Sequence, residues 1–180
     1  MAVVATGFFD GVHLGHRQII KALLQEAASR REKSVVVTFS QHPQTVLKSG
    51  TQAPAPLTSR SEKISILKGM GVDEVSVLPF TREFASMTAR EYLRDILVAR
   101  LGASCVILGY DSRLGSDTLC PEDLVSLCAA LGLDSRVVPP YCVDSKIVSS
   151  SLIRALMSSG NTSEAARLLG DRNDDILHSI

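Results

Sequence analysis

The feature that most restricts the fold of this 180-residue chain is a regular alternation between β-prone segments and amphipathic helical patterns. Each of five short apolar or β-branched runs is followed by a stretch whose apolar residues recur at helical spacing. The predicted strands cover residues 3–6, 34–39, 75–78, 106–108 and 134–138. This alternation predicts an α/β fold, a Rossmann-like doubly wound sheet of about five mostly parallel strands with right-handed crossovers. Ligands of such sheets bind at the carboxyl ends of the strands, so a site is expected there.

Local signals mark the ends of several predicted helices. Ser59 is a plausible N-cap, Thr88 begins a helix that Gly102 closes, and Pro121 suits the first turn of another. The 45% hydrophobic content is enough for one core, while the length is too short for two ordinary domains. We therefore expect one domain over residues 1–180, with residues 171–180 as a solvated tail. Residues 40–56 are expected to be a binding loop or flap rather than a domain boundary.

Charge and composition narrow the classes of ligand. Nineteen basic and nineteen acidic residues give a formal net charge of zero, so no overall field favours nucleic acid or an anionic membrane. Aromatic residues make up only 4%, and the apolar runs are far shorter than the ~18 residues of a membrane span. We expect small-molecule substrates, no nucleic acid and no membrane, and make no prediction about protein partners. The four scattered cysteines and the lack of a secretion signal predict a cytoplasmic protein with free thiols.

The first predicted strand runs into three glycines spaced four apart, Gly7, Gly11 and Gly15, and then into a helical pattern. Such a junction directs free backbone N–H groups and the positive end of a helix at one point, and glycines let a bulky anion approach the backbone. His13 and His16 are three residues apart, so if both lie in or near the first helical turn they share a face and can donate to the same triphosphate. This stretch therefore predicts a site for a triphosphate.

Three later stretches also follow strands or begin a helix. Residues 38–43 place Phe39 and His42 at a strand end, and residues 108–115 place Asp111 between two glycines. Asp111 could bind a ribose hydroxyl, a phosphate-bound Mg²⁺ through water, or a polar chain of the substrate. Residues 148–154 open a helix with serine hydroxyls and Arg154, a group suited to phosphate oxygens and to the charge that develops on them.

The spacing H-x-G-H in residues 13–16 resembles the signature of the nucleotidyltransferase superfamily, and G-x-F-D-G-V-H-x-G-H resembles its FAD synthetase (FMN adenylyltransferase) branch. Residues 38–43 resemble the T-F-x-x-H-P element of that family, and residues 148–154 resemble its I-S-S-T-x-I-R element, with Ser151 replacing threonine. Residues 109–115 resemble G-x-D-F-x-F-G, but Ser112 and Leu114 replace the two phenylalanines. Looser matches are L-T-x-x-x-E-K from residue 57 and L-P-F-x-x-x-F-A from residue 78, whose phenylalanines, Phe80 and Phe84, are expected to be packing residues.

The resemblance implies transfer of AMP from ATP to FMN, giving FAD and pyrophosphate by direct in-line attack, with Mg²⁺. The catalytic residues implied are His13, His16, Ser150, Ser151, Arg154 and Asp111. The ATP-binding residues implied are Gly7, Phe8, Phe9, Asp10, Gly11, Gly15, Gly109 and Val148. The FMN-binding residues implied are Phe39, His42, Pro43 and Arg113. No residue is expected to ligate a metal directly.

Two alternatives stay open at this point. The substitutions Ser112 and Leu114 allow a relative that acts on another phosphate-bearing acceptor. The second alternative is a protein that binds a nucleotide or a flavin and catalyses no reaction. Family members commonly continue into a riboflavin kinase domain, whereas this sequence ends about ten residues after a segment resembling the helix that precedes it, so riboflavin phosphorylation is not expected.

Overall fold

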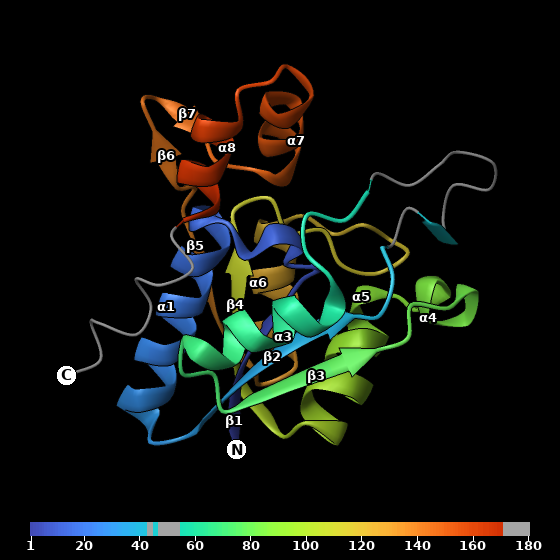
Figure 1. The fold of residues 1–180 in the computed structure, drawn as a ribbon. Coiled ribbons are helices and arrows are strands. Elements are labelled where there is room, and N and C mark those ends of the chain that lie inside the picture. Colours follow the sequence, from blue (N-terminus) through green and yellow to red (C-terminus); the bar gives the residue numbers. More distant parts are fainter. Residues whose placement is uncertain (43–44, 47–54, 171–180) are drawn as a thin grey trace.

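A computed structural model describes residues 1–42, 45–46 and 55–170 of the chain, which form a parallel sheet covered by helices (Figure 1). The sheet has five strands in the order β3-β2-β1-β4-β5, and every neighbouring pair is parallel. The strands are β1 (Ala2–Thr6), β2 (Lys33–Phe39), β3 (Glu74–Leu78), β4 (Ala103–Gly109) and β5 (Asp134–Val138). The predicted fold is confirmed. The strand order reverses between β1 and β4, which makes the carboxyl ends of these two strands the expected place for a ligand.

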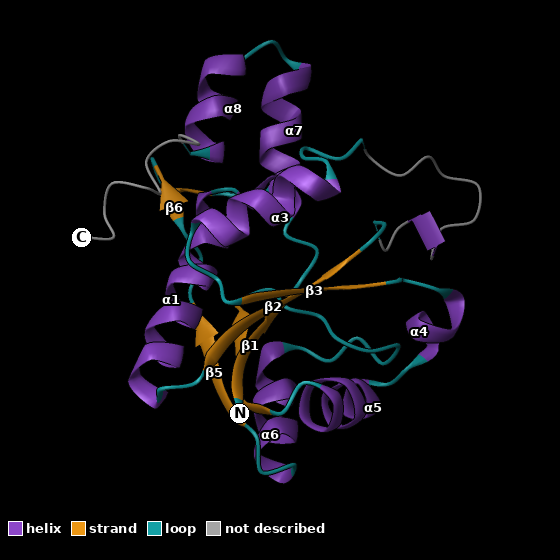
Figure 2. Cartoon of the chain, turned by 60° about the horizontal axis from the view of Figure 1, so that its bottom comes forward, coloured by secondary structure: helices purple, strands orange, loops and turns teal. Residues whose placement is uncertain are grey.

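Helices cover both faces of the sheet (Figure 2). One face carries α1 (Leu14–Arg30) and α3 (Arg60–Gly69), and the other carries α5 (Ala89–Glu91), its π-helical continuation η2 (Tyr92–Arg100) and α6 (Pro121–Ala130). Each face has its own apolar core, because strands buried on both sides alternate their side chains between two layers. The predicted helix starts at Ser59, Thr88 and Pro121 are confirmed: the two hydroxyls accept backbone N–H bonds from Glu62 and Glu91, and the proline occupies the first turn.

A third layer lies over the carboxyl end of the sheet (Figure 1). It consists of α7 (Ser150–Ser158), α8 (Thr162–Leu169) and a hairpin of β6 (Cys142–Val143) and β7 (Lys146–Ile147). A small apolar cluster around Val148, Ile153 and Leu168 holds this layer together. The hairpin and the short helices η1 (Asp10–Val12) and α4 (Arg82–Ser86) were not predicted from the sequence.

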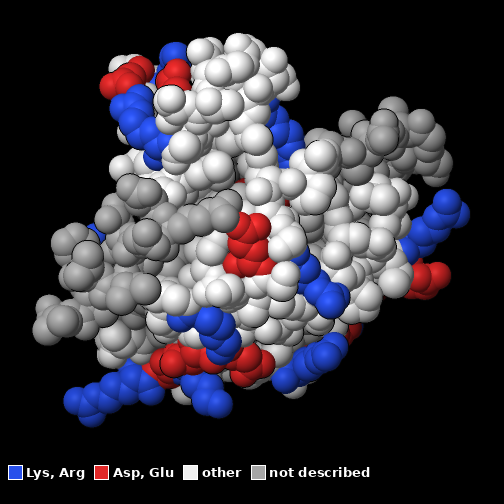
Figure 3. All heavy atoms as spheres, in the orientation of Figure 1, with Lys and Arg blue, Asp and Glu red and all other residues white. Residues whose placement is uncertain are grey.

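On the face shown in Figure 3, basic and acidic side chains lie beside one another, and neither sign of charge dominates. Within residues 1–42, 45–46 and 55–170, no helix is both long and apolar enough to cross a lipid bilayer. The predicted tail, residues 171–180, and most of the predicted flap, residues 43–44 and 47–54, lie outside the described residues.

Candidate active site

The loop after β1 brings the two histidines of the first motif into contact. His13 has extended backbone geometry and caps α1: its Nδ1 accepts the backbone N–H of His16 at 3.3 Å. The two imidazole rings stack, with centroids 3.6 Å apart and planes 18° from parallel. Because Nδ1 of His13 is an acceptor, the ring proton of the neutral side chain lies on Nε2. The histidines share one face, as the sequence predicted.

Burial decides the charge of both histidines. It lowers the pKa of His13 to about 4 and the pKa of His16 well below its usual value; the neighbouring His13 and Lys63 lower the latter further. Both rings are therefore neutral near pH 7 and offer N–H donors rather than positive charge. The Nδ1 atom of His16 has no hydrogen-bond partner among the described residues.

At the three glycines of the loop, a side chain would meet neighbouring parts of the chain, which is a further reason for glycine at these positions. A Cβ on Gly11, which has φ +78°, would lie 3.0–3.2 Å from side-chain atoms of Leu57 and Leu169. A Cβ on Gly15 would lie 3.0 Å from the carbonyl oxygen of Val148, and one on Gly7 would meet the ring of Phe9 at 3.3 Å. These glycines thus allow chain segments to pack closely, and the predicted approach of an anion to the loop backbone stays a prediction.

The fourth motif meets the first at Asp10. Arg154, on α7, forms an ion pair with the Asp10 carboxylate, and the hydroxyl of Ser150 donates to the Asp10 carbonyl at 3.1 Å. The other carboxylate oxygen accepts the backbone N–H of Leu57 at 2.9 Å. Ser151 is exposed at the start of the helix. The structure thus places Ser150, Ser151 and Arg154 beside the loop of residues 7–16, called the histidine loop below.

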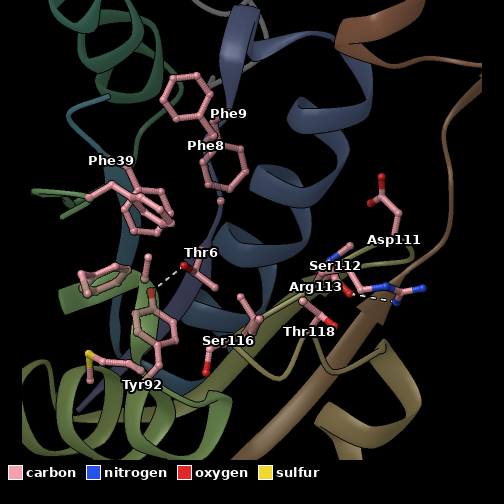
Figure 4. Close-up of a pocket in the computed structure, with 18 of the residues that line it drawn as sticks. Thr6, Phe8, Phe9, Phe39, Tyr92, Asp111, Ser112, Arg113, Ser116 and Thr118 are labelled. Carbon is pink, nitrogen blue, oxygen red and sulfur yellow. Dashed lines mark hydrogen bonds between the residues drawn. The ribbon is translucent and has the colours of Figure 1, made fainter. Parts of the chain in front are cut away.

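A cavity of about 590 Å³ opens next to His16 at the carboxyl ends of β1 and β4 (Figure 4). Its aromatic wall contains Phe39, Phe80, Phe84 and Tyr92. The phenylalanine rings contact one another, with centroids 5.2–5.5 Å apart. Phe80 and Phe84 were expected to be packing residues, and they do pack, but they also line the cavity.

The polar wall of the cavity comes from the loop after β4. Asp111 and Arg113 are exposed and lie across the space from the aromatic wall in Figure 4. The hydroxyl of Ser112 accepts the backbone N–H of Gly109 at 2.9 Å, so this short side chain bonds its own loop. Ser112 and Leu114 therefore line the cavity where the resembling motif has two aromatic rings.

A smaller cavity of about 270 Å³ lies on the other side of Phe8. His42 lines it and meets the Phe8 ring edge-on, with centroids 4.6 Å apart. Phe39 borders both cavities, whereas Pro43 lies outside the described residues. The expected FMN-binding residues are thus divided between two spaces.

Sequence reasoning missed three residues at this site. Thr6 and Tyr92 line the large cavity and share a hydrogen bond of 2.6 Å between their hydroxyl oxygens. Lys63 lines the small cavity and is only 3% exposed. Lys63 is the last residue of the L-T-x-x-x-E-K stretch, and this motif was the signal in the sequence that could have marked it as a site residue. The residues next to it in the chain do not indicate that it is buried.

Residues 1–152 match the sequence model of the FAD synthetase family. The chain belongs to the FAD synthetase family. It is 33% identical over 171 residues to the bifunctional riboflavin kinase/FMN adenylyltransferase of Escherichia coli strain K12, covering 93% of this chain and 54% of that protein. It is 32% identical to a protein of Listeria monocytogenes named FAD synthetase, covering 94% of this chain and 68% of the relative.

The fold is shared with a crystal structure described as a macrolide-efflux protein from Streptococcus pneumoniae. The two chains are 31% identical, and the TM-score is 0.85 over 94% of this chain and 56% of the other. The chain thus spans about half the length of the E. coli relative and of this structure. The resemblance to the FAD synthetase family, inferred from the four motifs, is confirmed.

Proposed function

We propose that this chain is an FMN adenylyltransferase, which transfers AMP from ATP to FMN and releases pyrophosphate. One observation carries the proposal: the histidine loop and the Ser150–Arg154 segment meet at the carboxyl edge of the sheet, and an aromatic cavity begins beside His16. The loop and the start of α7 suit a triphosphate. The cavity suits a flat, aromatic acceptor whose phosphate must come near the triphosphate, beside His16.

The reaction requires positioning and charge stabilisation rather than a protein nucleophile. In-line attack of the FMN phosphate on the α-phosphorus forms the new P–O bond as the bond to pyrophosphate breaks. His13 and His16 would donate hydrogen bonds to the triphosphate, with His16 nearer the α-phosphate. Ser150, Ser151 and Arg154 would bind the departing β- and γ-phosphates and stabilise the charge that moves onto them.

The acceptor would occupy the large cavity. Phe39, Phe80, Phe84 and Tyr92 offer ring faces and edges to an isoalloxazine, and ring pairs of this kind stabilise by about 0.5–1.5 kcal/mol each. Asp111 would lie between nucleotide and acceptor, and Arg113 would face the acceptor from the opposite wall.

Magnesium fits the site only as a phosphate-bound ion. The described residues contain no cluster of three or more His, Cys, Asp or Glu that could hold a metal. Asp111 is the single carboxylate among the residues that line the large cavity, whereas Asp10 is paired with Arg154. Mg²⁺ commonly binds through phosphates, waters and one or two carboxylates, which suits Asp111 acting through water. When bound, the ion would neutralise charge on the departing pyrophosphate.

Ser112 and Leu114 favour a second candidate, adenylyl transfer to a different phosphate-bearing acceptor. Short side chains on the wall of the cavity reduce the aromatic surface available to a flavin. The four aromatic residues of the opposite wall support FMN as the first choice.

The test is to incubate the protein with ATP, Mg²⁺ and one acceptor at a time, and to measure pyrophosphate and the mass of the product. FMN should give FAD. Riboflavin is the matched control because it has the same ring system without the attacking phosphate, and it should give no pyrophosphate. Pyrophosphate only with another phosphate-bearing acceptor would favour the second candidate, and FMN binding without pyrophosphate would indicate a non-catalytic binding protein.

A cytoplasmic location remains part of this proposal. All four cysteines, Cys105, Cys120, Cys128 and Cys142, are free thiols, which agrees with a reducing compartment.

A further inference from the structure

The carbonyl oxygen of Phe8, in the histidine loop, receives two side-chain donors from outside the loop. Lys63 Nζ donates to it at 2.7 Å from α3, and Thr38 Oγ1 donates at 3.0 Å from β2. The Lys63 ammonium also lies 4.0 Å from the centroid of the Phe8 ring, a cation–π contact. Two independent elements thus fix the orientation of one peptide group.

A lysine buried in this way needs a reason, because removing an ammonium group from water is costly unless it is paired. Lys63 is 3% exposed and has no ion pair within 4.0 Å among the described residues. Its hydrogen-bond acceptor is a neutral carbonyl. The hydrogen bond to the loop therefore explains the position of Lys63 better than a contribution to stability does.

Fixing the Phe8 carbonyl also fixes the next N–H group. In a planar trans peptide the N–H of Phe9 points opposite to the Phe8 carbonyl, and the described residues contain no cis peptide bond. The carbonyl faces Lys63 and the small cavity, whereas Phe9 lines only the large cavity, where His16 lies. The Phe9 N–H has no hydrogen-bond partner in the part of the chain that the structure describes.

The backbone of Phe9 is itself in an unfavourable conformation. Its φ of 52° and ψ of 40° are left-handed, which is uncommon for a bulky aromatic residue. Such conformations persist when surrounding contacts impose them, and they concentrate at ligand sites. The two donors to the Phe8 carbonyl are contacts of this kind.

We propose that Lys63 is a positioning residue, which holds the Phe8–Phe9 peptide so that the Phe9 N–H is presented to a phosphate of the reacting pair and adds a nearby buried positive charge. This inference rests on the proposed adenylyl transfer. Since both histidines are neutral near pH 7, Lys63 supplies charge to the histidine loop that they do not.

The surroundings of Lys63 make its charge sensitive to pH. Burial lowers its pKa to about 8, and the carboxylate of Asp10 on η1 opposes that shift. Other titratable groups beside this site are His16 on α1 and His42 after β2, both with lowered pKa values, and Arg154 on α7, which is paired with Asp10 and acts on His42. Arg60, on the same helix as Lys63, also borders the small cavity. The positive charge of Lys63 is therefore lost as the pH rises through about 8, while a bound phosphate dianion would favour its retention.

The test compares Lys63→Met, which keeps the length and removes the charge, with Lys63→Arg, which stays charged at all accessible pH values. Lys21→Met, at an exposed position on α1, is the matched control. With ATP, Mg²⁺ and FMN at pH 7, we expect Lys63→Met to lower kcat by about tenfold or more, with a smaller change in KM for FMN. Lys21→Met should match the wild type.

The pH profile separates positioning from a purely structural role. Wild-type kcat should decline above about pH 8, Lys63→Arg should shift that decline to higher pH, and Lys63→Met should lack it. A wild-type alkaline limb that persists unchanged in Lys63→Met would overturn the proposal. If Lys63→Met does not fold, Thr38→Val removes the other donor to the same carbonyl, and should lower kcat while keeping the alkaline limb.

Binding of ATP, measured by calorimetry without FMN, distinguishes failure of this inference from failure of the proposed function. If FMN is not the acceptor, ATP affinity should still weaken between pH 7 and pH 9.5 in the wild type, and this weakening should be absent in Lys63→Arg. Identical pH dependence in the two proteins would reject the role of Lys63 whatever the acceptor is.

Discussion

The carboxylate of Asp10 and the guanidinium of Arg154 form an ion pair that joins positions 144 residues apart in the sequence. The Asp10 side chain is 5% exposed and that of Arg154 23% exposed. Through this pair and the hydrogen bond from Ser150, α7 is attached to the histidine loop. The two halves of the candidate phosphate site thus depend on one carboxylate.

Replacing Asp10 with Asn should therefore destabilise the protein. Asn retains an oxygen for the backbone N–H groups of Leu57 and Thr58 but leaves Arg154 without its counter-charge. Breaking one partner of a buried pair costs about 3–5 kcal/mol, and since Arg154 is partly exposed we expect about 2–3 kcal/mol. Denaturant unfolding measures this loss. Arg154→Gln alone should leave Asp10 buried and unpaired, so the double variant should lose less than the sum of the two single losses; additive losses would contradict the coupling.

His16→Ala should reduce turnover without unfolding the protein. His16 is partly buried, stacks on His13 and borders the large cavity, so its loss removes a donor at the point where the proposed α-phosphate lies. Loss of one preorganised donor of this type costs about 10²–10³-fold in kcat. Steady-state kinetics with ATP and FMN checks the magnitude, and thermal melting checks the fold. Gln25→Ala, exposed on the same helix, is the control, and wild-type turnover in His16→Ala would reject the assignment.

His13 should make the protein sensitive to acid. Its folded-state pKa of about 4 lies below the ordinary value of 6.5, so between these values the unfolded chain binds more protons than the folded one. The free energy of unfolding should therefore fall as the pH is lowered from about 6.5 to about 4, by about 3 kcal/mol from this group. His13→Asn keeps an N-cap acceptor and removes the titration. Urea unfolding at pH 7 and pH 4.5 should show a smaller drop for the variant, and equal drops would contradict the cause given.

The centre of the sheet could be predicted from the sequence because β1, β2 and β4 are buried on both faces and appear as largely apolar runs. The β6–β7 hairpin could not, because its strands have two residues each and its turn, Asp144 and Ser145, lacks the usual glycine. The sequence also predicted that the motifs meet at one edge of the sheet, because the carboxyl ends of parallel strands lie at the same edge. The burial of Lys63 could not be predicted, since Lys63 contacts the carbonyl and the ring of Phe8, 55 residues away in the sequence.

Ser112→Phe should strengthen flavin binding if the large cavity holds FMN. Ser112 lines the cavity opposite four aromatic residues, and a ring at this position would supply a second aromatic wall. One added ring contact of about 0.5–1.5 kcal/mol corresponds to a decrease of about two- to tenfold in KM for FMN, with KM for ATP unchanged.

The same substitution removes the hydroxyl that accepts the Gly109 N–H, which should cost about 1 kcal/mol of stability. Ser112→Ala removes that hydrogen bond without adding a ring, so it separates the effect on the loop from the effect on the flavin. Steady-state kinetics and thermal melting of the two variants are compared with the wild type. A lower melting temperature in both variants with a lower KM for FMN only in Ser112→Phe is the expected result. The opposite result is a KM for FMN that rises in Ser112→Phe and stays at the wild-type value in Ser112→Ala. It would mean that the acceptor does not place its ring against this wall. The short side chains at positions 112 and 114 would then suit a bulkier or different acceptor.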